Sequence, residues 1–175
     1  MNRKRIVILR IGHRIGRDKR ITTHIGLAAR ALGASGMILT AEDREVEQSI
    51  NDVVFRWGGD FWVKSGCRWQ DIVKSWNGAI VHLTMYGENI LDLEEVIQKD
   101  SRDILVVIGA EKVPYGVYEH ADWNVAVTNQ PHSELAALAV FLDRIQGGRE
   151  LESKDFGGKI RILGKKLGKE VLKDA

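Results

Sequence analysis

The sequence predicts an α/β domain with a mostly parallel sheet flanked by helices. Short apolar runs, typical of buried strands, alternate along the chain with segments whose apolar residues recur at helical spacing. Of the 175 residues, 44% are hydrophobic and 29% are charged, the composition of a globular protein with a substantial core. The longest apolar runs, such as residues 104–110, are too short to span a bilayer.

The first half of the chain is expected to contain three strands and three helices. Residues 6–11 are apolar except for Arg10, so this run is expected to be a buried strand. Thr22 and Thr23 are candidate caps for a helix over 22–32, which Gly33 would end. The remaining expected elements of this half are strands at 36–41 and 61–63 and helices at 43–57 and 69–76.

The second half continues the alternation. Residues 103–108 are the most strand-like segment, and Ser133 opens a helix that is expected to run to residue 145. After Gly147 and Gly148 the chain becomes polar and rich in lysine, so we predict one domain over residues 1–148 and a basic extension over 149–175. The remaining expected elements are strands at 79–84 and 124–128 and a helix at 89–99.

Charge is distributed unevenly along the chain. Residues 1–30 contain nine Lys or Arg side chains and one acid, whereas residues 31–150 contain ten bases and nineteen acids. Residues 151–175 add seven bases and four acids. A strongly basic segment beside an acidic body favours docking of a polyanion, RNA or DNA, at one edge. The alternative is a solvated basic N-terminus without a ligand.

Two loops are the first candidates for a functional site. Residues 109–116 and 128–134 follow the last two predicted strands, and ligands of open α/β sheets bind outside the carboxyl ends of the strands. The first loop offers Gly109 for close backbone approach and the carboxylate of Glu111. The second gathers amide, imidazole, hydroxyl and carboxylate groups at a helix start, although Ser133 alone could be an ordinary helix cap.

Several other function classes lose support. The sequence contains no phosphate-binding Gly-x-x-x-x-Gly-Lys-Ser/Thr loop, no Gly-x-Gly-x-x-Gly after a strand and no His-Glu-x-x-His zinc motif. Cys67 is the single cysteine, which excludes an internal disulfide framework. Because residues 1–5 pass directly into a strand without a signal-like apolar core, we expect a cytoplasmic protein.

Specific motifs resemble the SPOUT class of RNA methyltransferases. Residues 104–114 (ILVVIGAEKVP) with 121–127 (ADWNVAV) resemble the second motif of that class, and residues 129–139 (NQPHSELAALA) resemble the third. Within the class, the chain is most similar to the archaeal tRNA 2'-O-methyltransferases that act on cytidine 56 of the T-loop. That similarity covers residues 5–145 and rests on the segments 9–14 (LRIGHR), 17–24 (RDKRITTH), 29–31 (ARA) and 82–87 (HLTMYG).

The resemblance implies a fold, a cofactor and partners. The fold would contain a C-terminal trefoil knot over about residues 104–145, an exception to unknotted connectivity. S-adenosylmethionine would bind in the knot, tRNA would be the substrate, and the protein would be a homodimer whose partner chain completes each active site. The implied cofactor-binding residues are Leu83, Gly109, Ala110, Glu111, Lys112, Val113, Val127, Thr128, Asn129, Gln130, Pro131, His132, Ser133 and Glu134.

One departure from the family pattern concerns the catalytic arginine. Relatives that methylate ribose carry an arginine six residues before the glycine that ends the first motif's helix, and counting back from Gly33 gives Leu27. We therefore expect the role to pass to Arg20 or Arg14, with Asn129 and Ser133 orienting the 2'-hydroxyl. A guanidinium would polarise the hydroxyl rather than accept its proton, because it is too basic to do so.

The resemblance thus implies an S-adenosylmethionine-dependent tRNA ribose 2'-O-methyltransferase without a metal. Two alternatives stay open at this point. One is an RNA-binding knot protein that does not turn over S-adenosylmethionine, and the other is a methyltransferase that modifies an RNA base.

Overall fold

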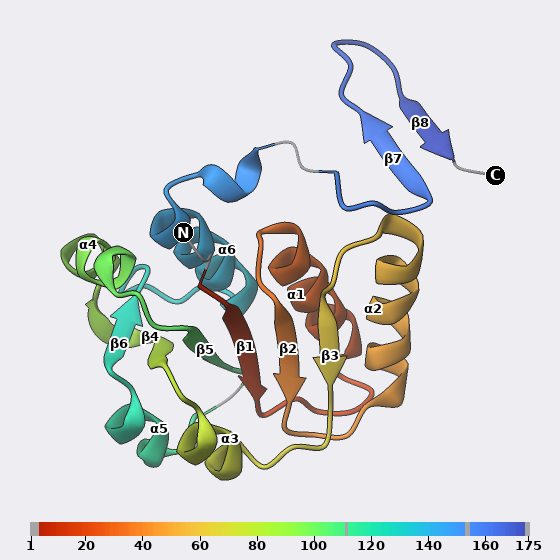
Figure 1. Ribbon diagram of the computed structural model, residues 1–175. Helices are drawn as coiled ribbons and strands as arrows, with labels where there is room; N and C mark the ends of the chain where they lie inside the picture. The colour runs from red at the N-terminus through yellow and green to blue at the C-terminus, as the bar shows by residue number, and fades with distance from the viewer. Residues whose placement is uncertain (1–3, 111, 153–154, 174–175) are drawn as a thin grey trace.

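The computed structural model describes residues 4–110, 112–152 and 155–173 (Figure 1). In this part of the chain six strands form one sheet in the order β3-β2-β1-β5-β4-β6, and every neighbouring pair is parallel. The expected α/β architecture is confirmed. The strands are β1 (Ile6–Ile11), β2 (Gly36–Leu39), β3 (Trp62–Lys64), β4 (Ala79–Asn89), β5 (Ile104–Gly109) and β6 (Trp123–Ala126).

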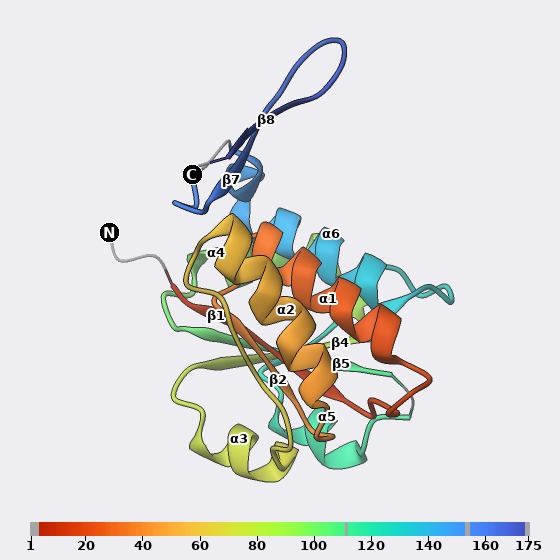
Figure 2. The same cartoon turned by 90° about the vertical axis from the view of Figure 1, so that its right-hand side faces the viewer.

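Helices cover both faces of the sheet (Figure 2). One face packs on α1 (Lys19–Ala31), α2 (Arg44–Trp57), α4 (Ile90–Lys99) and α6 (Glu134–Gln146). The other face packs on α3 (Trp69–Ser75) and α5 (Tyr115–His120). Alternate residues of a strand point to opposite faces, so Ile6 and Ile8 join the larger core while Val7 and Leu9 join the smaller one. Because both faces of β1, β2 and β5 are buried, these three strands are apolar runs without alternation, broken only by Arg10 in β1.

Helix ends show where local sequence signals succeed and fail. Asp43, the first residue of the helix predicted over 43–57, caps α2 by accepting from the amides of Glu45 and Val46, each at 3.1 Å. Helix α1 begins at Lys19, earlier than predicted, so the prediction that Thr22 and Thr23 cap it is wrong. The physical reason is that the Thr22 hydroxyl is buried and bonded to side chains outside the helix.

Four elements of the described chain were absent from the prediction: α5, a short 3-10 helix and two strands. Helix α5 (Tyr115–His120) lies where a loop was expected to run to residue 116, and its six residues are too few to show helical periodicity. The basic extension contains a short 3-10 helix, η1 (Arg149–Leu151), and an antiparallel hairpin of β7 (Ile160–Leu163) and β8 (Glu170–Lys173). Figure 1 shows the hairpin standing away from the sheet, beyond the end of α2.

The C-terminal extension is attached to the domain near the end of α2. The Gly59 amide donates to the Phe156 carbonyl at 2.8 Å, and a β-bridge joins Gly58 to Gly157. A Cβ on Gly58, where φ is +78°, would lie 2.2 Å from the Phe156 carbonyl oxygen, so only glycine permits this approach. The Arg30 guanidinium lies 4.8 Å from the centre of the Phe156 ring. No helix among the described residues is long and apolar enough to cross a membrane.

Candidate functional site

Strand β4 carries an irregularity that shapes the site. Leu83 and Glu88 both pair with Val125 of β6, so residues 84–87 bulge out of the strand. The Asn129 side-chain amide holds the bulge by donating to the carbonyls of Met85 at 2.7 Å and Gly87 at 3.3 Å. A Cβ on Gly87 would lie 2.4 Å from the Asn124 carbonyl oxygen, so glycine is needed where the bulge returns to the strand.

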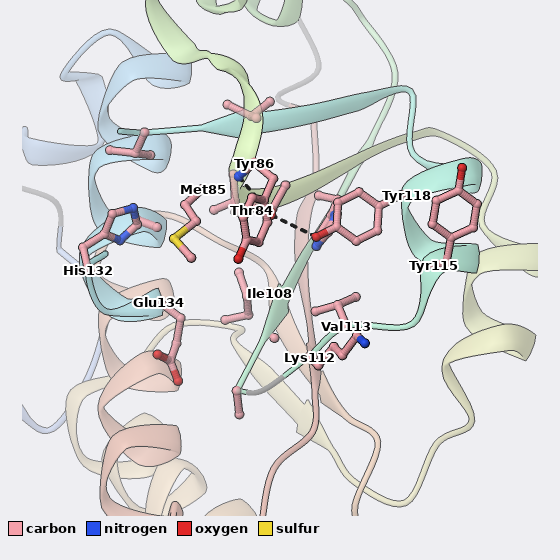
Figure 3. A pocket seen from close by; sticks show the side chains of 17 residues that line it. Thr84, Met85, Tyr86, Ile108, Lys112, Val113, Tyr115, Tyr118, His132 and Glu134 are labelled. Atoms are coloured by element: carbon pink, nitrogen blue, oxygen red, sulfur yellow. Dashed lines mark hydrogen bonds between the residues drawn. The ribbon is translucent and has the colours of Figure 1, made fainter. Parts of the chain in front are cut away.

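A cavity of about 830 Å³ lies between this bulge and the carboxyl ends of β5 and β6 (Figure 3). Figure 3 shows His132 and Glu134 on one side of the cavity and Lys112, Val113 and Tyr118 on the other. Ligands of open α/β sheets bind outside the carboxyl ends of the strands, and this cavity lies there. The lining residues are His82, Leu83, Thr84, Met85, Tyr86, Ile108, Gly109, Ala110, Lys112, Val113, Tyr115, Tyr118, Val125, Val127, His132, Glu134 and Ala137.

His82 presents a buried nitrogen without a proton at the cavity wall. The Asn124 amide nitrogen donates to the Tyr118 carbonyl at 3.1 Å, which turns the Asn124 side-chain oxygen toward His82. That oxygen lies 2.9 Å from Nδ1 of His82, so Nδ1 carries the proton. Burial lowers the pKa of His82 and keeps the ring neutral. Nε2 is therefore a bare acceptor, and it has no hydrogen-bond partner among the described residues.

Aromatic rings lead from the cavity wall to its rim. The His82 and Tyr118 rings meet edge to face with centres 4.5 Å apart, and the Tyr118 and Tyr115 rings stack at 6.3 Å. The Tyr118 hydroxyl lies 3.2 Å from the Thr84 hydroxyl, which joins α5 to the bulge. Tyr86 and Tyr115 are 76% and 74% exposed, so the rim offers two open aromatic surfaces.

Glu134 supplies a carboxylate to the cavity. It is the first residue of α6, directly after Ser133, whose hydroxyl caps that helix by accepting from the Ala136 amide at 3.1 Å. The Glu134 carboxylate accepts from the guanidinium of Arg10 at 2.9 Å. A mostly apolar lining with a few placed polar groups is typical of a small-molecule site. Among the described residues, no group of three or more His, Cys, Asp or Glu could hold a metal ion.

The structure brings together part of the predicted cofactor site. Glu111 lies outside the described residues. Thr128, Asn129, Gln130, Pro131 and Ser133 do not line the cavity, although Asn129 and Ser133 hold the bulge and the helix start that shape it. The predicted residues that line the cavity are Leu83, Gly109, Ala110, Lys112, Val113, Val127, His132 and Glu134.

The two predicted catalytic arginines do not line the cavity of their own chain. Arg14 donates to both carboxylate oxygens of Asp18, at 2.9 and 3.0 Å, and this contact lowers the pKa of Asp18 to about 2. Arg20 is exposed in the first turn of α1 rather than in a loop. Among the described lining residues, Lys112 is the one Lys or Arg side chain.

Sequence reasoning missed the aromatic part of the site. His82, Thr84, Met85 and Tyr86 belong to a segment that carries the family resemblance, but the resemblance assigns a site role to none of these four. The signal that could have found the bulge is Gly87, a glycine three residues beyond the end of the strand predicted at 79–84. Tyr115 and Tyr118 lie on α5, whose short length concealed their shared helix face.

Comparison with known proteins identifies relatives over nearly the whole chain. Residues 57–172 match the family described as tRNA ribose 2'-O-methyltransferase, aTrm56. The chain is 56% identical to a tRNA (cytidine(56)-2'-O)-methyltransferase of Methanothrix thermoacetophila, over 96% of this chain and 97% of the relative. Proteins of the same name from Methanocella arvoryzae and Pyrococcus abyssi are 51% and 52% identical over 97% of this chain, and 98% and 90% of the relatives are covered.

Solved structures share the fold at low sequence identity. The SpoU methyltransferase AviRb of Streptomyces viridochromogenes, in complex with AdoMet, has a TM-score of 0.59 at 16% identity, over 88% of this chain and 61% of that chain. The A. aeolicus TrmH/SpoU tRNA modifying enzyme has a TM-score of 0.56 at 15% identity, over 86% of this chain and 78% of that one. The chain thus spans about three fifths of AviRb, and the likeness confirms the expected sheet and helices.

Proposed function

The chain belongs to the family of tRNA ribose 2'-O-methyltransferases, and from this membership we propose that it transfers the methyl group of S-adenosylmethionine to the 2'-oxygen of cytidine 56 in tRNA. The observation that carries the proposal is identity of 51% to 56% to proteins of that activity, over almost their full length. This support favours ribose methylation over the two alternatives, binding of RNA without turnover and methylation of a base.

The cavity fits the cofactor chemically. Its apolar walls, its size and Glu134, the one acidic side chain among its described lining residues, suit a nucleoside-sized ligand that carries positive charge. The bare Nε2 of His82 can accept one hydrogen bond from such a ligand. When bound, S-adenosylmethionine supplies an electrophilic methyl group on a sulfonium. Leu83, Gly109 to Val113, and Val127 to Glu134 are the proposed contacts.

In the reaction, the protein positions the 2'-oxygen against the methyl carbon and polarises the 2'-hydroxyl. The 2'-oxygen must approach the methyl carbon in line with the breaking carbon–sulfur bond, and holding the two at that distance lowers the barrier. A guanidinium beside the hydroxyl stabilises the negative charge that develops on oxygen as its proton leaves. We assign this role to Arg20, with Arg14 as the alternative, and we keep Asn129 and Ser133 as proposed orienting groups.

A homodimer would bring that guanidinium to the cavity. Arg20 and Arg14 lie outside the cavity of their own chain, and the resemblance implies that a partner chain completes each site. The proposal therefore places Arg20 of one protomer at the cavity of the other. A C-terminal trefoil knot over about residues 104–145 belongs to the same proposal, and the likeness to the SpoU fold supports it.

The RNA would meet the carboxyl edge of the sheet. Tyr86 and Tyr115 offer exposed rings on which an unstacked base can lie, and Arg17 and Lys112 offer charges for phosphates. Sequence-specific recognition of RNA commonly uses such splayed bases.

The decisive experiment uses unmodified tRNA transcript with methyl-labelled S-adenosylmethionine, followed by nuclease mapping. We expect label on the ribose of cytidine 56 and none on a matched transcript with 2'-deoxycytidine at that position. Label on the deoxy transcript would indicate base methylation. Absence of label on the ribose transcript, with intact binding of RNA, would leave only the silent RNA-binding protein.

A second experiment tests the shared active site. Gly109→Val and Arg20→Ala chains carrying different tags are co-expressed, and the mixed dimers are isolated by both tags. If Arg20 acts on the partner's cavity, mixed dimers regain one of their two sites, about half of wild-type activity. If Arg20 acts within its own chain, mixed dimers stay inactive, which would overturn the assignment.

A further inference from the structure

Arg10 is a buried cation that the proposed mechanism does not use. It lies in the carboxyl half of β1, on the face covered by α1 and α6, and its side chain is 0% exposed. Burying a guanidinium is costly unless acceptors surround it. Two side chains accept from it: Thr22 of α1, at 2.8 Å from Nε, and Glu134 of α6, at 2.9 Å from Nη1.

The hydrogen bonds around Arg10 have one consistent direction. The Thr22 hydroxyl accepts from Arg10 Nε, and it lies 2.9 Å from Nδ1 of the buried His13. The hydroxyl proton is thus free to go to His13 Nδ1. The other ring nitrogen of His13, Nε2, lies 2.8 Å from the Asp43 carboxylate and donates to it. With the His13 proton assigned to Nε2, every bond then has one donor and one acceptor, from Arg10, which can only donate, to Asp43, which accepts.

The outer end of this chain of bonds is rigid. Asp43 is buried and also accepts from two backbone amides at the start of α2. From Asp43 the hydrogen bonds lead to His13 in the loop after β1, then to Thr22 in α1 and then to Arg10 in β1. They end at Glu134, the first residue of α6. The chain therefore connects elements that are distant in sequence, and its other end is the carboxylate at the cavity.

The hydrogen bonds of Arg10 differ from those expected of a buried ion pair that only stabilises the fold. Nη2 of Arg10 has no hydrogen-bond partner among the described residues, and an apolar side chain would fill the same space without that cost. What the guanidinium does that an apolar residue cannot do is hold one oxygen of Glu134. The second oxygen of Glu134 makes no hydrogen bond that the described residues supply.

We propose that Arg10 is a positioning residue: with its orientation set by Thr22, His13 and Asp43, it fixes the Glu134 carboxylate in the cavity as the counter-charge for the cationic methyl donor. This inference rests on the proposed function, because it takes the ligand to be S-adenosylmethionine. It makes Thr22, which contacts neither cavity nor ligand, a determinant of cofactor affinity.

The test measures binding of S-adenosylmethionine by calorimetry in the absence of tRNA. Thr22→Val removes the hydroxyl at nearly constant volume, and we expect Kd to rise about tenfold. Thr22→Ser keeps the hydroxyl and should restore binding. Thr23→Val is the matched control, because the hydrogen bond that the Thr23 hydroxyl makes with the described residues goes to the Lys19 carbonyl within the same helix. Thermal unfolding of each variant separates loss of binding from loss of fold.

A double-mutant cycle with Glu134→Ala decides whether the effect passes through Glu134. If it does, Thr22→Val adds no further loss of affinity in the Glu134→Ala background. Additive losses, or an unchanged Kd in Thr22→Val, would overturn the inference. Methyl transfer by the wild-type protein is measured alongside, so that failure of the proposed function is seen independently of this result.

Discussion

The two edges of the sheet use basic side chains for different purposes. At the amino edge, the Lys4 ammonium donates to three main-chain carbonyls at the end of α4, at 2.7 to 3.2 Å, and Arg5 pairs with Asp103 at 2.7 Å. At the carboxyl edge, Arg17 and Arg20 are exposed and have no ion pair among the described residues. Positive charge is thus used for structure at one edge and remains available to a polyanion at the other.

The comparison changes how the charge of the first thirty residues is understood. Their excess of bases predicted one docking edge, but β1 (Ile6–Ile11) separates Lys4 and Arg5 at the amino edge from Arg17 and Arg20 at the carboxyl edge, and Arg10 is buried within the strand. Further along the same segment, Arg14 and Lys19 pair with Asp18 and Glu45. Sequence charge therefore overstates the RNA-binding surface, and the position of each base in the fold decides its role.

The largest expected effect is at the cavity. Gly109→Val places a branched side chain in the lining, and we expect Kd for S-adenosylmethionine to rise at least about a hundredfold, roughly 2.7 kcal/mol. Gly164→Val in the hairpin turn is the matched control, because a Cβ there meets no atom within 4 Å. Calorimetry measures the affinity of both variants for S-adenosylmethionine. Equal affinities in Gly109→Val and Gly164→Val would exclude Gly109 from the site.

The next largest effect distinguishes a catalytic role for Arg20 from a tRNA-binding role for Arg17. Arg20→Ala should lower kcat about a hundredfold with little change in the affinities for tRNA and S-adenosylmethionine, as expected for a contact made in the transition state. Arg17→Ala should weaken tRNA binding and leave kcat intact. Single-turnover rates at saturating tRNA distinguish the two, and a loss of affinity alone in Arg20→Ala would show that it only contacts phosphate.

Salt dependence compares the two edges directly. Replacing Arg17 and Lys112 by Gln should reduce the slope of log Kd for tRNA against log salt by about one for each phosphate that the protein no longer neutralises. Replacing Lys4 and Arg5 by Gln should leave the slope unchanged, since both already have partners within the protein. A larger change from the amino-edge pair would reverse the assignment of the edges.

The free energy of unfolding should depend on the amino-edge side chains more than on the carboxyl-edge side chains, the reverse of the salt dependence of tRNA binding. Lys4→Met removes the donor to three carbonyls and should lower the free energy of unfolding by about 1 kcal/mol, as expected for a partly buried hydrogen-bonding group. Arg17→Met should change it by less than about 0.5 kcal/mol. Denaturant unfolding of both variants measures this, and equal values would contradict a structural role for the amino edge.

The smallest effect is the pH dependence contributed by His82. Burial lowers its pKa below the ordinary value of 6.5, so the unfolded chain takes up this proton before the folded chain does. The stability it contributes is present above pH 6.5 and is lost as the pH falls toward the folded-state pKa. The free energy of unfolding, measured by denaturant from pH 7.5 to 5.5, should therefore decline less steeply in His82→Gln than in the wild type, and equal declines would contradict this contribution.

Much of the fold and part of the site could be predicted from local sequence. The buried strands, including residues 104–108, were recognisable because strands covered on both faces are continuous apolar runs. Leu83, Gly109 and Glu134 were placed at the site by resemblance, and they do line one cavity. Helix α5 was missed for want of length, and the bulge at 84–87 was missed because pairing with β6, some forty residues away, creates it.

By itself the sequence determined the α/β class, the order of most elements and the family, because these depend on local periodicity and on short motifs. The tertiary structure alone decided that Arg10 is buried while Arg17 and Arg20 are exposed, and that Asn129 holds a bulge instead of lining the cavity. These outcomes depend on contacts such as Arg10 with Glu134, 124 positions apart. Side-chain type alone cannot specify such contacts, because the same guanidinium binds a phosphate in water and a carboxylate in a core.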